Sequence, residues 1–390
     1  MQSMNKTSGF SLIELMVGML VGLIGTMVIF QVFAVAEGQK RTTTSGGDAS
    51  QSAAFALFSM ERELRESGQG FNNKGLLGCS IRVYDDTSPA PKNRLMGLAP
   101  AVITPGVGIA PDQVSISYIS SDVVNPPAAL IASVAGTGAI VVDTPGFTKP
   151  GDVLVISNLD NGEIKQVAGV PVPCTMFQVT NNLKITAQTL EHAPAGGTYT
   201  DERGASQKIR LNHPTQGLDN GFAPPIITYP PGVLDDGGYV FNLGNAPLTA
   251  VTYYIANNRL MRRDDMGDTS NPMEIADGIV QMKVLYGVDA NNDKQISTSE
   301  WTNTSPTTPQ AWQRLRAVKL ALVARSALRE KANAAGVCNT TTAQPLWYGA
   351  GASGANITLD VSADPDWMCY RYKIFQSIVP IRNMAWTPYR

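Results

Sequence analysis

The stretch FSLIELMVGMLVGLIGTMVIFQVFAVA, residues 10–36, decides the architecture, because it is the most hydrophobic segment of the chain and holds a single carboxylate, Glu14. At 1.5 Å per residue, a helix of this length reaches roughly 40 Å, enough to cross a bilayer with some tilt. The first of the 25 prolines is Pro89, so no helix breaker interrupts the N-terminal region. The sequence therefore predicts one long helix that begins in this stretch.

The composition indicates a β-rich remainder. The 390 residues are 43% hydrophobic and 16% charged, which is ample for one or two packed globular units. The 36 glycines and 25 prolines indicate strands joined by many turns. With a net charge of −2, neither sign dominates, so nucleic acid is not an expected partner.

Three interpretations of residues 10–36 compete. The first is a plain membrane anchor. The second is a cleaved secretory signal, with Ala34-Val35-Ala36 as the cleavage site, but the apolar core is longer than the 7–15 residues of such signals and only Lys6 precedes it. The third explains Glu14, because a carboxylate in an apolar interior needs a partner. Cleavage before Phe10 creates a new amine, which Glu14 of a neighbouring parallel helix can neutralise.

The segment GFSLIELMVGMLVGLIG resembles the N-terminal signature of the type IV pilin family, in which Gly9, Phe10, Leu12, Ile13, Glu14 and Leu15 match in place. The resemblance implies cleavage by a prepilin peptidase between Gly9 and Phe10, followed by N-methylation of Phe10. It also implies that the helix serves as both membrane anchor and filament core, with Glu14 needed for filament assembly. FALFSMERELRESGQGF, residues 55–71, resembles the corresponding stretch of PilW-type minor pilins.

These observations divide the chain into four parts: a leader peptide (1–9), a transmembrane and filament-core helix (10–36), an amphipathic continuation of the helix (37–68) and a β-rich head (69–390). In the continuation, Phe55, Leu57, Phe58, Met60 and Leu64 form the apolar stripe, and the charged residues Glu61, Arg62, Glu63, Arg65 and Glu66 lie mostly elsewhere. TTTSGGDAS, residues 42–50, has weak helix propensity and is a candidate flexible joint.

The resemblance implies a pilin-type head, in which an antiparallel sheet packs on the second half of the helix. The extra length before residue 240 indicates an enlarged β elaboration, and the fold class is therefore expected to be α+β. Val318, Leu320 and Leu322 show the period-2 alternation of a half-buried strand. The predicted strands are residues 113–120, 139–143, 152–157, 176–180, 239–243, 250–256, 279–288, 316–326 and 372–381. Several of these segments resemble PilW-like proteins in order, whereas residues 181–238 carry no such resemblance.

Four cysteines, Cys79, Cys174, Cys338 and Cys369, are predicted to form disulfides, because an even count in an envelope-facing domain favours them. There is no C-x-x-C pair and only two histidines, which disfavours a zinc site. Three connectivities are possible. Cys338–Cys369 with Cys79–Cys174 is favoured, since the first pair closes the shortest C-terminal loop.

The segment DANNDKQISTSE, residues 289–300, matches the ligand spacing of a calcium loop. One structural calcium ion is expected, and its oxygen ligands would come from Asp289, Asn291, Asp293, Gln295, Ser297 and Glu300. Lys294 departs from the pattern, because glycine normally makes the turn there and lysine must adopt a positive φ. The alternative is a polar β-turn with chance carboxylates.

Other motifs do not favour enzymatic chemistry. GAGASG, residues 349–354, fits G-x-G-x-x-G but has strand-like sequence after it, which favours a surface loop over a dinucleotide site. His192 and His213 lie in turn-rich stretches, and no serine has nucleophile-elbow flanks. MRRDD, residues 261–265, is interpreted as a solvated strand end. The chain is therefore not expected to be an enzyme.

The sequence and the resemblance together favour a structural minor pilin of a type IV pilus, placed at or near the tip, where it helps to prime assembly and supports adhesion or motility. The expected partners are other minor pilins, the major pilin, a large tip adhesin and the prepilin peptidase. The expected location is the bacterial inner membrane, with the head in the periplasm, and then the extracellular pilus. The alternatives are a minor pseudopilin of a type II secretion system and a signal-anchored envelope enzyme.

Overall fold

The computed structural model describes residues 11–70, 73–87, 92–119, 126–144, 148–168, 170–181, 188–215, 217–222, 228–245, 248–267, 270–333 and 335–385. The leader peptide, the predicted cleavage site at Gly9 and the predicted methylation site at Phe10 lie outside these residues.

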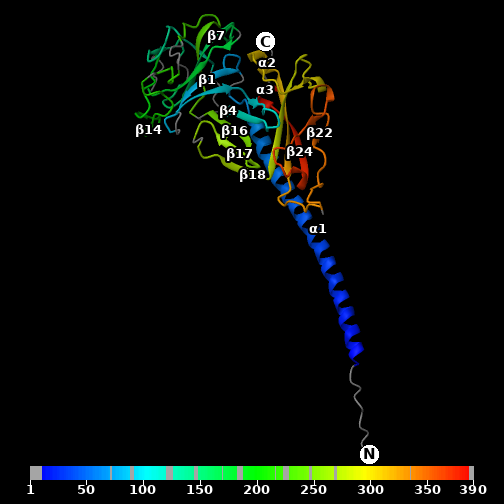
Figure 1. The fold of residues 1–390 in the computed structure, drawn as a ribbon. Helices are drawn as coiled ribbons and strands as arrows, with labels where there is room; N and C mark the ends of the chain where they lie inside the picture. The colour runs from blue at the N-terminus through cyan, green and yellow to red at the C-terminus, as the bar shows by residue number, and fades with distance from the viewer. Residues whose placement is uncertain are drawn as a thin grey trace, which may run out of the picture.

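One helix, α1 (Leu12–Glu66), forms a rod that projects from a β-rich head (Figure 1). It runs without interruption through residues 42–50, so the predicted joint is helical. The helix ends where the Ser67 amide bonds back to the Leu64 carbonyl and Gly68 adopts a left-handed φ of +77°. Glycine accepts that conformation readily, which makes it a common helix terminator.

Two sheets hold the C-terminal half of α1. The four-stranded sheet has the order β20-β19-β21-β24, and the five-stranded sheet has the order β18-β17-β16-β4-β3. The first contains β19 (Ile279–Val288), β20 (Trp301–Thr302), β21 (Leu315–Arg325) and β24 (Tyr372–Pro380), and the second contains β3 (Ala101–Thr104), β4 (Gln113–Ile119), β16 (Leu248–Ala256), β17 (Arg259–Asp264) and β18 (Met273–Asp277).

A seven-stranded sheet forms a distal module, farther from the rod (Figure 1). It contains β1 (Cys79–Tyr84), β2 (Asn93–Leu98), β5 (Ala128–Ala129), β7 (Val153–Asp160), β8 (Glu163–Ile164), β11 (Cys174–Gln178) and β15 (Gly237–Asn242). The strand pairs β6 (Ile140–Val141) with β12 (Thr189–Leu190), β9 (Gln166–Val167) with β10 (Val170–Pro171), β13 (Thr198–Thr200) with β14 (Ser206–Lys208), and β22 (Leu346–Trp347) with β23 (Ile357–Thr358) complete the strands.

Short helices connect the strands. They are α2 (Pro309–Gln313), α3 (Arg382–Ala385), and the 3₁₀ helices η1 (Thr298–Glu300), η2 (Ala352–Gly354) and η3 (Trp367–Cys369).

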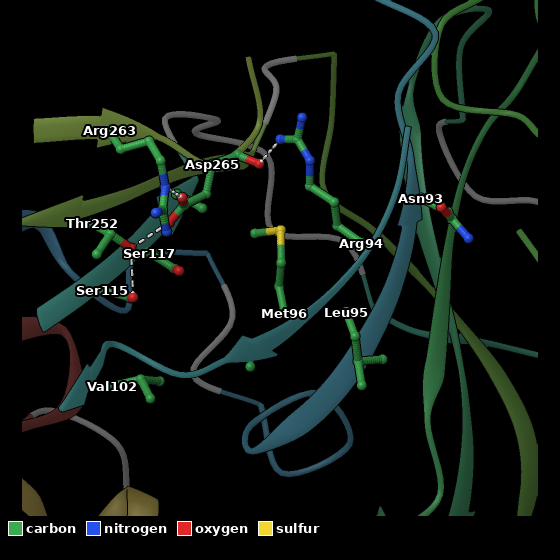
Figure 2. A pocket seen from close by; sticks show the side chains of 12 residues that line it. Asn93, Arg94, Leu95, Met96, Val102, Ser115, Ser117, Thr252, Arg263 and Asp265 are labelled. Carbon is green, nitrogen blue, oxygen red and sulfur yellow. Dashed lines mark hydrogen bonds and ion pairs between the residues drawn. The ribbon is translucent and has the colours of Figure 1, made fainter. Parts of the chain in front are cut away.

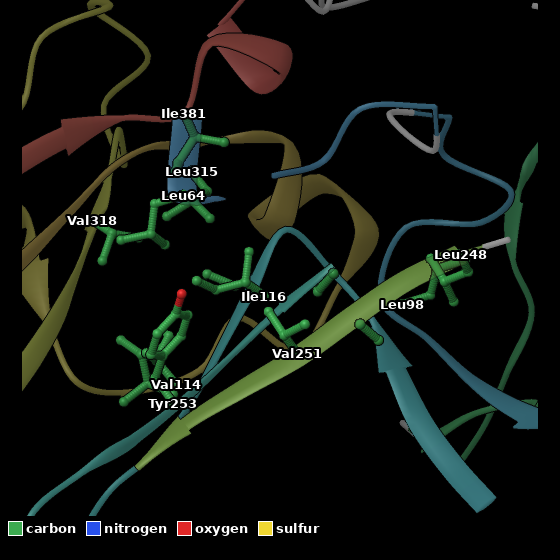
Figure 3. Close-up of a cluster of buried hydrophobic side chains, with 14 of the residues drawn as sticks. Leu64, Leu98, Val114, Ile116, Leu248, Val251, Tyr253, Leu315, Val318 and Ile381 are labelled. Carbon is green, nitrogen blue, oxygen red and sulfur yellow. The ribbon is translucent and has the colours of Figure 1, made fainter. Parts of the chain in front are cut away.

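The main core is built around the helix. Met60 and Leu64 of α1 are fully buried with strand residues from both neighbouring sheets, and Figure 3 shows Leu64 beside Leu315, Val318 and Ile381. Alternate residues of β21 serve opposite faces, since Leu320 packs in the helix-side core and Ala321 in a second cluster with Trp347. The helix is therefore part of the head's core and not an appendage.

The structure confirms the α+β architecture and the predicted strands, although 139–143 shrinks to the two-residue β6. The strand at 279–288 has the predicted bounds, and Val318, Leu320 and Leu322 are all buried on one face. One feature departs from an antiparallel head: β1 pairs with β11 in parallel, with Ile81 opposite Cys174. The long connection between β1 and β11 permits this pairing, since a hairpin can join antiparallel strands only.

Candidate assembly interface

The N-terminal half of α1 carries a continuous apolar surface with no cover in the monomer. The exposed fraction is 80% for Leu12 and 74% for Phe30, and the large apolar side chains between them are all at least half exposed. The most apolar window has a mean hydropathy of 2.3 with none of it buried, and α1 is long and apolar enough to cross a membrane. Burying such a surface is favourable by about 25 cal/mol per Å², so it requires lipid or a protein partner.

Glu14 is the one acidic side chain of this surface and lies in the first turn of α1. The exposed backbone amides of a helix N-terminus favour a nearby negative charge, so this position suits a carboxylate. The structure leaves the Glu14 side chain exposed. Its predicted partner, the Phe10 amine, lies outside the described residues, so the pairing stays a prediction.

The C-terminal half of α1 carries a buried carboxylate, Glu63. The predicted placement of Glu63 away from the buried apolar stripe is therefore wrong. Only 5% of the Glu63 side chain is exposed, and its Oε1 accepts a hydrogen bond from Nε of Arg262 at 3.0 Å. Glu63 is three residues from Met60 and therefore lies beside it on the helix surface, at the edge of the buried face. Burial and the neighbouring Glu63 carboxylate raise the pKa of Tyr253.

Arg262 also corrects the interpretation of residues 261–265 as a solvated strand end. Three quarters of its side chain is covered, because it faces the helix from β17. Its neighbour Arg263 pairs instead with Asp265, at 2.7 Å between Nε and Oδ1. The segment is therefore a contact between helix and sheet.

In the predicted calcium loop, backbone amides of the loop itself donate hydrogen bonds to the carboxylates of Asp289 and Glu300. Both carboxylate oxygens of Asp289 accept backbone amides, from Asp293 and Lys294, each at 3.0 Å. Glu300 accepts the amide of Ala290 at 2.8 Å and that of Ser297 at 2.8 Å. These amides lower the pKa of Glu300, with the Ser297 amide the largest cause. The carboxylates thus tie the two ends of the loop together.

Two further features bear on the calcium prediction. Lys294 has a φ of 67°, which confirms that lysine adopts the strained turn conformation. The guanidinium of Arg316 lies 3.5 Å from Oδ2 of Asp289 and supplies positive charge where a cation would bind. Within the described ranges, no group of three or more His, Cys, Asp or Glu side chains is arranged to hold a metal. Calcium binding by Asp289, Asn291, Asp293, Gln295, Ser297 and Glu300 stays a prediction.

The disulfides follow the favoured connectivity. Cys79 is joined to Cys174 across β1 and β11, and Cys338 is joined to Cys369 in the C-terminal part of the head. All four sulfurs are therefore used, with none free.

The remaining motifs lie apart from one another. GAGASG lies in the loop of the β22–β23 hairpin. The short 3₁₀ helix η2 forms the second half of the motif, and the strand β23 follows it. His192 packs against Phe177 and His213 against Tyr84, both in the distal module, and burial lowers the pKa of each histidine. Each histidine therefore packs against an aromatic ring of the distal module.

A polar groove of about 580 Å³ lies where the distal module meets the five-stranded sheet (Figure 2). Arg94 of β2 crosses it to donate to the Asp265 carbonyl. Asp265 in turn accepts a hydrogen bond from Thr252, whose hydroxyl lies 2.6 Å from that of Ser115. No sequence pattern indicated this groove, because its residues come from five separate strands, β2, β3, β4, β16 and β17.

Comparison with known proteins gives two matches. The family model described as Type IV Pilus-assembly protein W (PilW) matches residues 252–383, which include β19, β21, β24 and the loop at 289–300. The model described as Prokaryotic N-terminal methylation motif matches residues 4–30. No curated protein and no solved structure matches the chain. The distal module between residues 73 and 245 lies outside both matched ranges.

Proposed function

We propose that the chain is a structural minor pilin placed at or near the tip of a type IV pilus, where it helps to prime assembly, because the PilW model matches residues 252–383 and the N-terminal methylation motif matches residues 4–30. The observation that carries this proposal is the uncovered apolar half of α1, which begins beside Glu14 and has the methylation motif over its start.

The exposed rod has two possible covers, and the proposed function uses both in turn. In the inner membrane, lipid covers the apolar surface while the head stays in the periplasm. In the filament, the rods of neighbouring subunits replace the lipid, and Glu14 of one subunit neutralises the methylated Phe10 amine of another. A prepilin peptidase acts first, since the amine does not exist before cleavage after Gly9.

The shape of the head supports a tip position. Its distal module extends to one side of the rod axis, beyond the two sheets that hold α1 (Figure 1). A broad head crowds lateral neighbours in a shaft, but it is accommodated at an end that has neighbours on one side only. Other minor pilins and the major pilin are the proposed partners, with a large tip adhesin as a further one and adhesion or motility as the proposed role.

The test is Glu14→Val, compared with Asp48→Asn, an exposed position, as a control on the same helix. We expect surface pili to fall strongly in Glu14→Val and to stay normal in Asp48→Asn, while both proteins remain in the membrane fraction. N-terminal mass spectrometry of the parent should find methyl-Phe10 as the first residue. Normal pilus counts in Glu14→Val, or a mature chain that starts after Ala36, would overturn the proposal. Loss of enzyme secretion with normal pili would instead indicate a type II secretion pseudopilin.

A further inference from the structure

A second groove, of about 430 Å³, lies where the rod leaves the head. One wall is α1 at Ala34, Glu37 and Ser45, and the other is the segment 326–331, which follows β21. The Leu328 amide donates to the Ser45 hydroxyl at 3.2 Å and holds the segment against the helix. In Figure 1 this part of the head lies beside α1, above the projecting part of the rod. We call it the base groove.

The base groove lies at the level where a bilayer surface must be. A helix needs about 20 residues to cross the hydrocarbon core. The apolar run ends at Ala36 and Glu37 is the first charged residue after it, so this end of the run marks the edge of the hydrocarbon core nearest the head. The wall of the groove formed by Ala34 and Glu37 therefore lies in the headgroup layer of the leaflet nearest the head.

The charges that line the groove are of both signs. Glu37 is exposed on the helix side, and Lys331 is exposed on the opposite wall. Arg329 lies 3.0 Å from Asp366, and that pair is about half exposed. Glu330 is neutralised by Arg371 at 2.9 Å. With Arg329 paired to Asp366 and Glu330 to Arg371, the groove presents the Glu37 carboxylate on one side and the Lys331 ammonium on the other.

We propose that the base groove binds the headgroup of a membrane phospholipid that carries both a phosphate and a primary ammonium group. Lys331 contacts the phosphate, and Glu37 accepts hydrogen bonds from the ammonium. Charge-assisted hydrogen bonds of this kind are the stronger ones, and their direction here distinguishes a zwitterionic headgroup from a purely anionic one. The inference rests on the membrane-anchored state of the proposed minor pilin.

The occupant is a lipid and not a free solute, because the groove is continuous with the lipid-covered surface. Ala34 belongs both to the apolar half of α1 and to the wall of the groove. The acyl chains of a lipid in the groove can therefore lie along α1 toward Phe30 and Phe33, which are 74% and 70% exposed. A detached phosphate compound lacks that second contact.

The test uses the full chain in nanodiscs that contain equal amounts of phosphatidylethanolamine, phosphatidylglycerol and phosphatidylcholine with identical acyl chains. After transfer to mild detergent, native mass spectrometry counts the lipids that stay bound. We expect phosphatidylethanolamine to be retained preferentially. Glu37→Gln and Lys331→Gln should each lower its retention roughly three- to tenfold, the effect of losing one exposed charge-assisted hydrogen bond.

A matched control and a second readout complete the test. The double variant Arg203→Gln/Lys208→Gln removes exposed charges from the distal module and should leave retention unchanged. Hydrogen exchange of the amides at 326–333 should be slower in nanodiscs than in detergent, and Glu37→Gln should reverse part of that protection. Equal retention of the three lipids, or unchanged retention in both groove variants, overturns the inference while the proposed minor pilin stands. Failure of the chain to enter nanodiscs overturns both.

Discussion

Glu63 and Arg262 join the helix to the five-stranded sheet through a charge pair that is largely removed from water. Its geometry is good, at 3.0 Å, but both charges lose hydration on folding. Such a pair contributes little net stability compared with an apolar pair, whereas the loss of one partner is costly because it leaves the other charge uncompensated. The pair therefore specifies how the helix is placed on the sheet.

At this scale we expect Arg262→Ala to lower the free energy of unfolding by about 2–4 kcal/mol, since it leaves the Glu63 carboxylate buried alone. The measurement is urea unfolding of the detergent-solubilised chain, followed by near-UV circular dichroism. Arg259→Ala is the control on the same strand. Its partner Glu274 is 43% exposed, so the expected change is under about 1 kcal/mol. Equal losses in the two variants would contradict a special role for the buried pair.

Among the elements, α1 is unusual in holding Gly46 and Gly47 in the middle of a continuous helix. Nothing lies within 4 Å of the position where a Cβ would be added at either residue, so alanine fits without a clash. Glycine costs about 1 kcal/mol relative to alanine in a helix interior. The pair therefore weakens α1 locally, just below the buried half.

We expect Gly46→Ala/Gly47→Ala to slow hydrogen exchange of the amides at 44–52 by roughly tenfold or more, as about 1 kcal/mol per site predicts. The melting temperature of the head should change little, because the head's core begins at Ala53. If surface pilus counts also fall, assembly needs the helix to bend at this point. Unchanged exchange would mean that the two glycines do not weaken the helix.

The loop at 289–300 makes stability depend on pH. The pKa of Glu300 is lowered in the folded chain, so its contribution is fully present above the ordinary value of 4.5 and is lost as the pH falls through the lower folded value. Melting temperatures between pH 7 and pH 3 should therefore fall less steeply below pH 4.5 in Glu300→Gln than in the parent. Glu191→Gln, at an exposed position, should keep the parent's pH profile.

Glu300→Gln, together with Asp289→Ala, also tests the predicted calcium ion. If the side-chain and carbonyl oxygens of the loop coordinate calcium, calcium should raise the melting temperature of the parent and have no effect on that of Asp289→Ala or Glu300→Gln. The ion must displace amide hydrogen bonds and compete with Arg316 at 3.5 Å from Asp289. A melting temperature that is the same in calcium and in a chelator would reject the ion.

For the whole molecule, the apolar surface that needs a cover is concentrated in one part of the chain. The large exposed apolar side chains from Leu12 to Val35 lie on the projecting rod, whereas those of the head are scattered. We expect a chain that lacks residues 1–36 to stay soluble and monomeric without detergent, as measured by size-exclusion chromatography with light scattering. Phe55→Ser/Phe58→Ser in that chain controls for the two exposed phenylalanines on the retained part of α1. Aggregation of both the truncated chain and its Phe55→Ser/Phe58→Ser variant would mean that the surface responsible for self-association lies elsewhere in the head.

The sequence predicted the elements whose signal is local. Residues 279–288 form a strand because ten consecutive residues favour it, and β21 and β24 also lie within one residue of their predicted bounds. The strand β17 was missed because RLMRRD is highly charged. The charge of Arg262 in that strand is compensated by Glu63, 199 positions earlier in the chain, and no local pattern reports such a partner.

The candidate site divides in the same way. Glu14 and the apolar rod follow from periodicity and composition, because lipid or a partner helix recognises a continuous surface. The base groove requires the segment after β21 to return to α1 at Ser45, a contact between residues 283 positions apart. Distant returns of this kind depend on the order of strands in the sheets, which sequence spacing does not determine.

The burial of Met60 and Leu64 among strands of two sheets has a mechanical consequence. In the proposed filament, a pull on the rod must carry the head with it. Because the end of the helix is enclosed by strands drawn from distant parts of the chain, tension applied at the rod is shared as shear across many hydrogen-bonded strands. We therefore expect the subunit to bear tension along the axis of α1 without separation of the head from the helix.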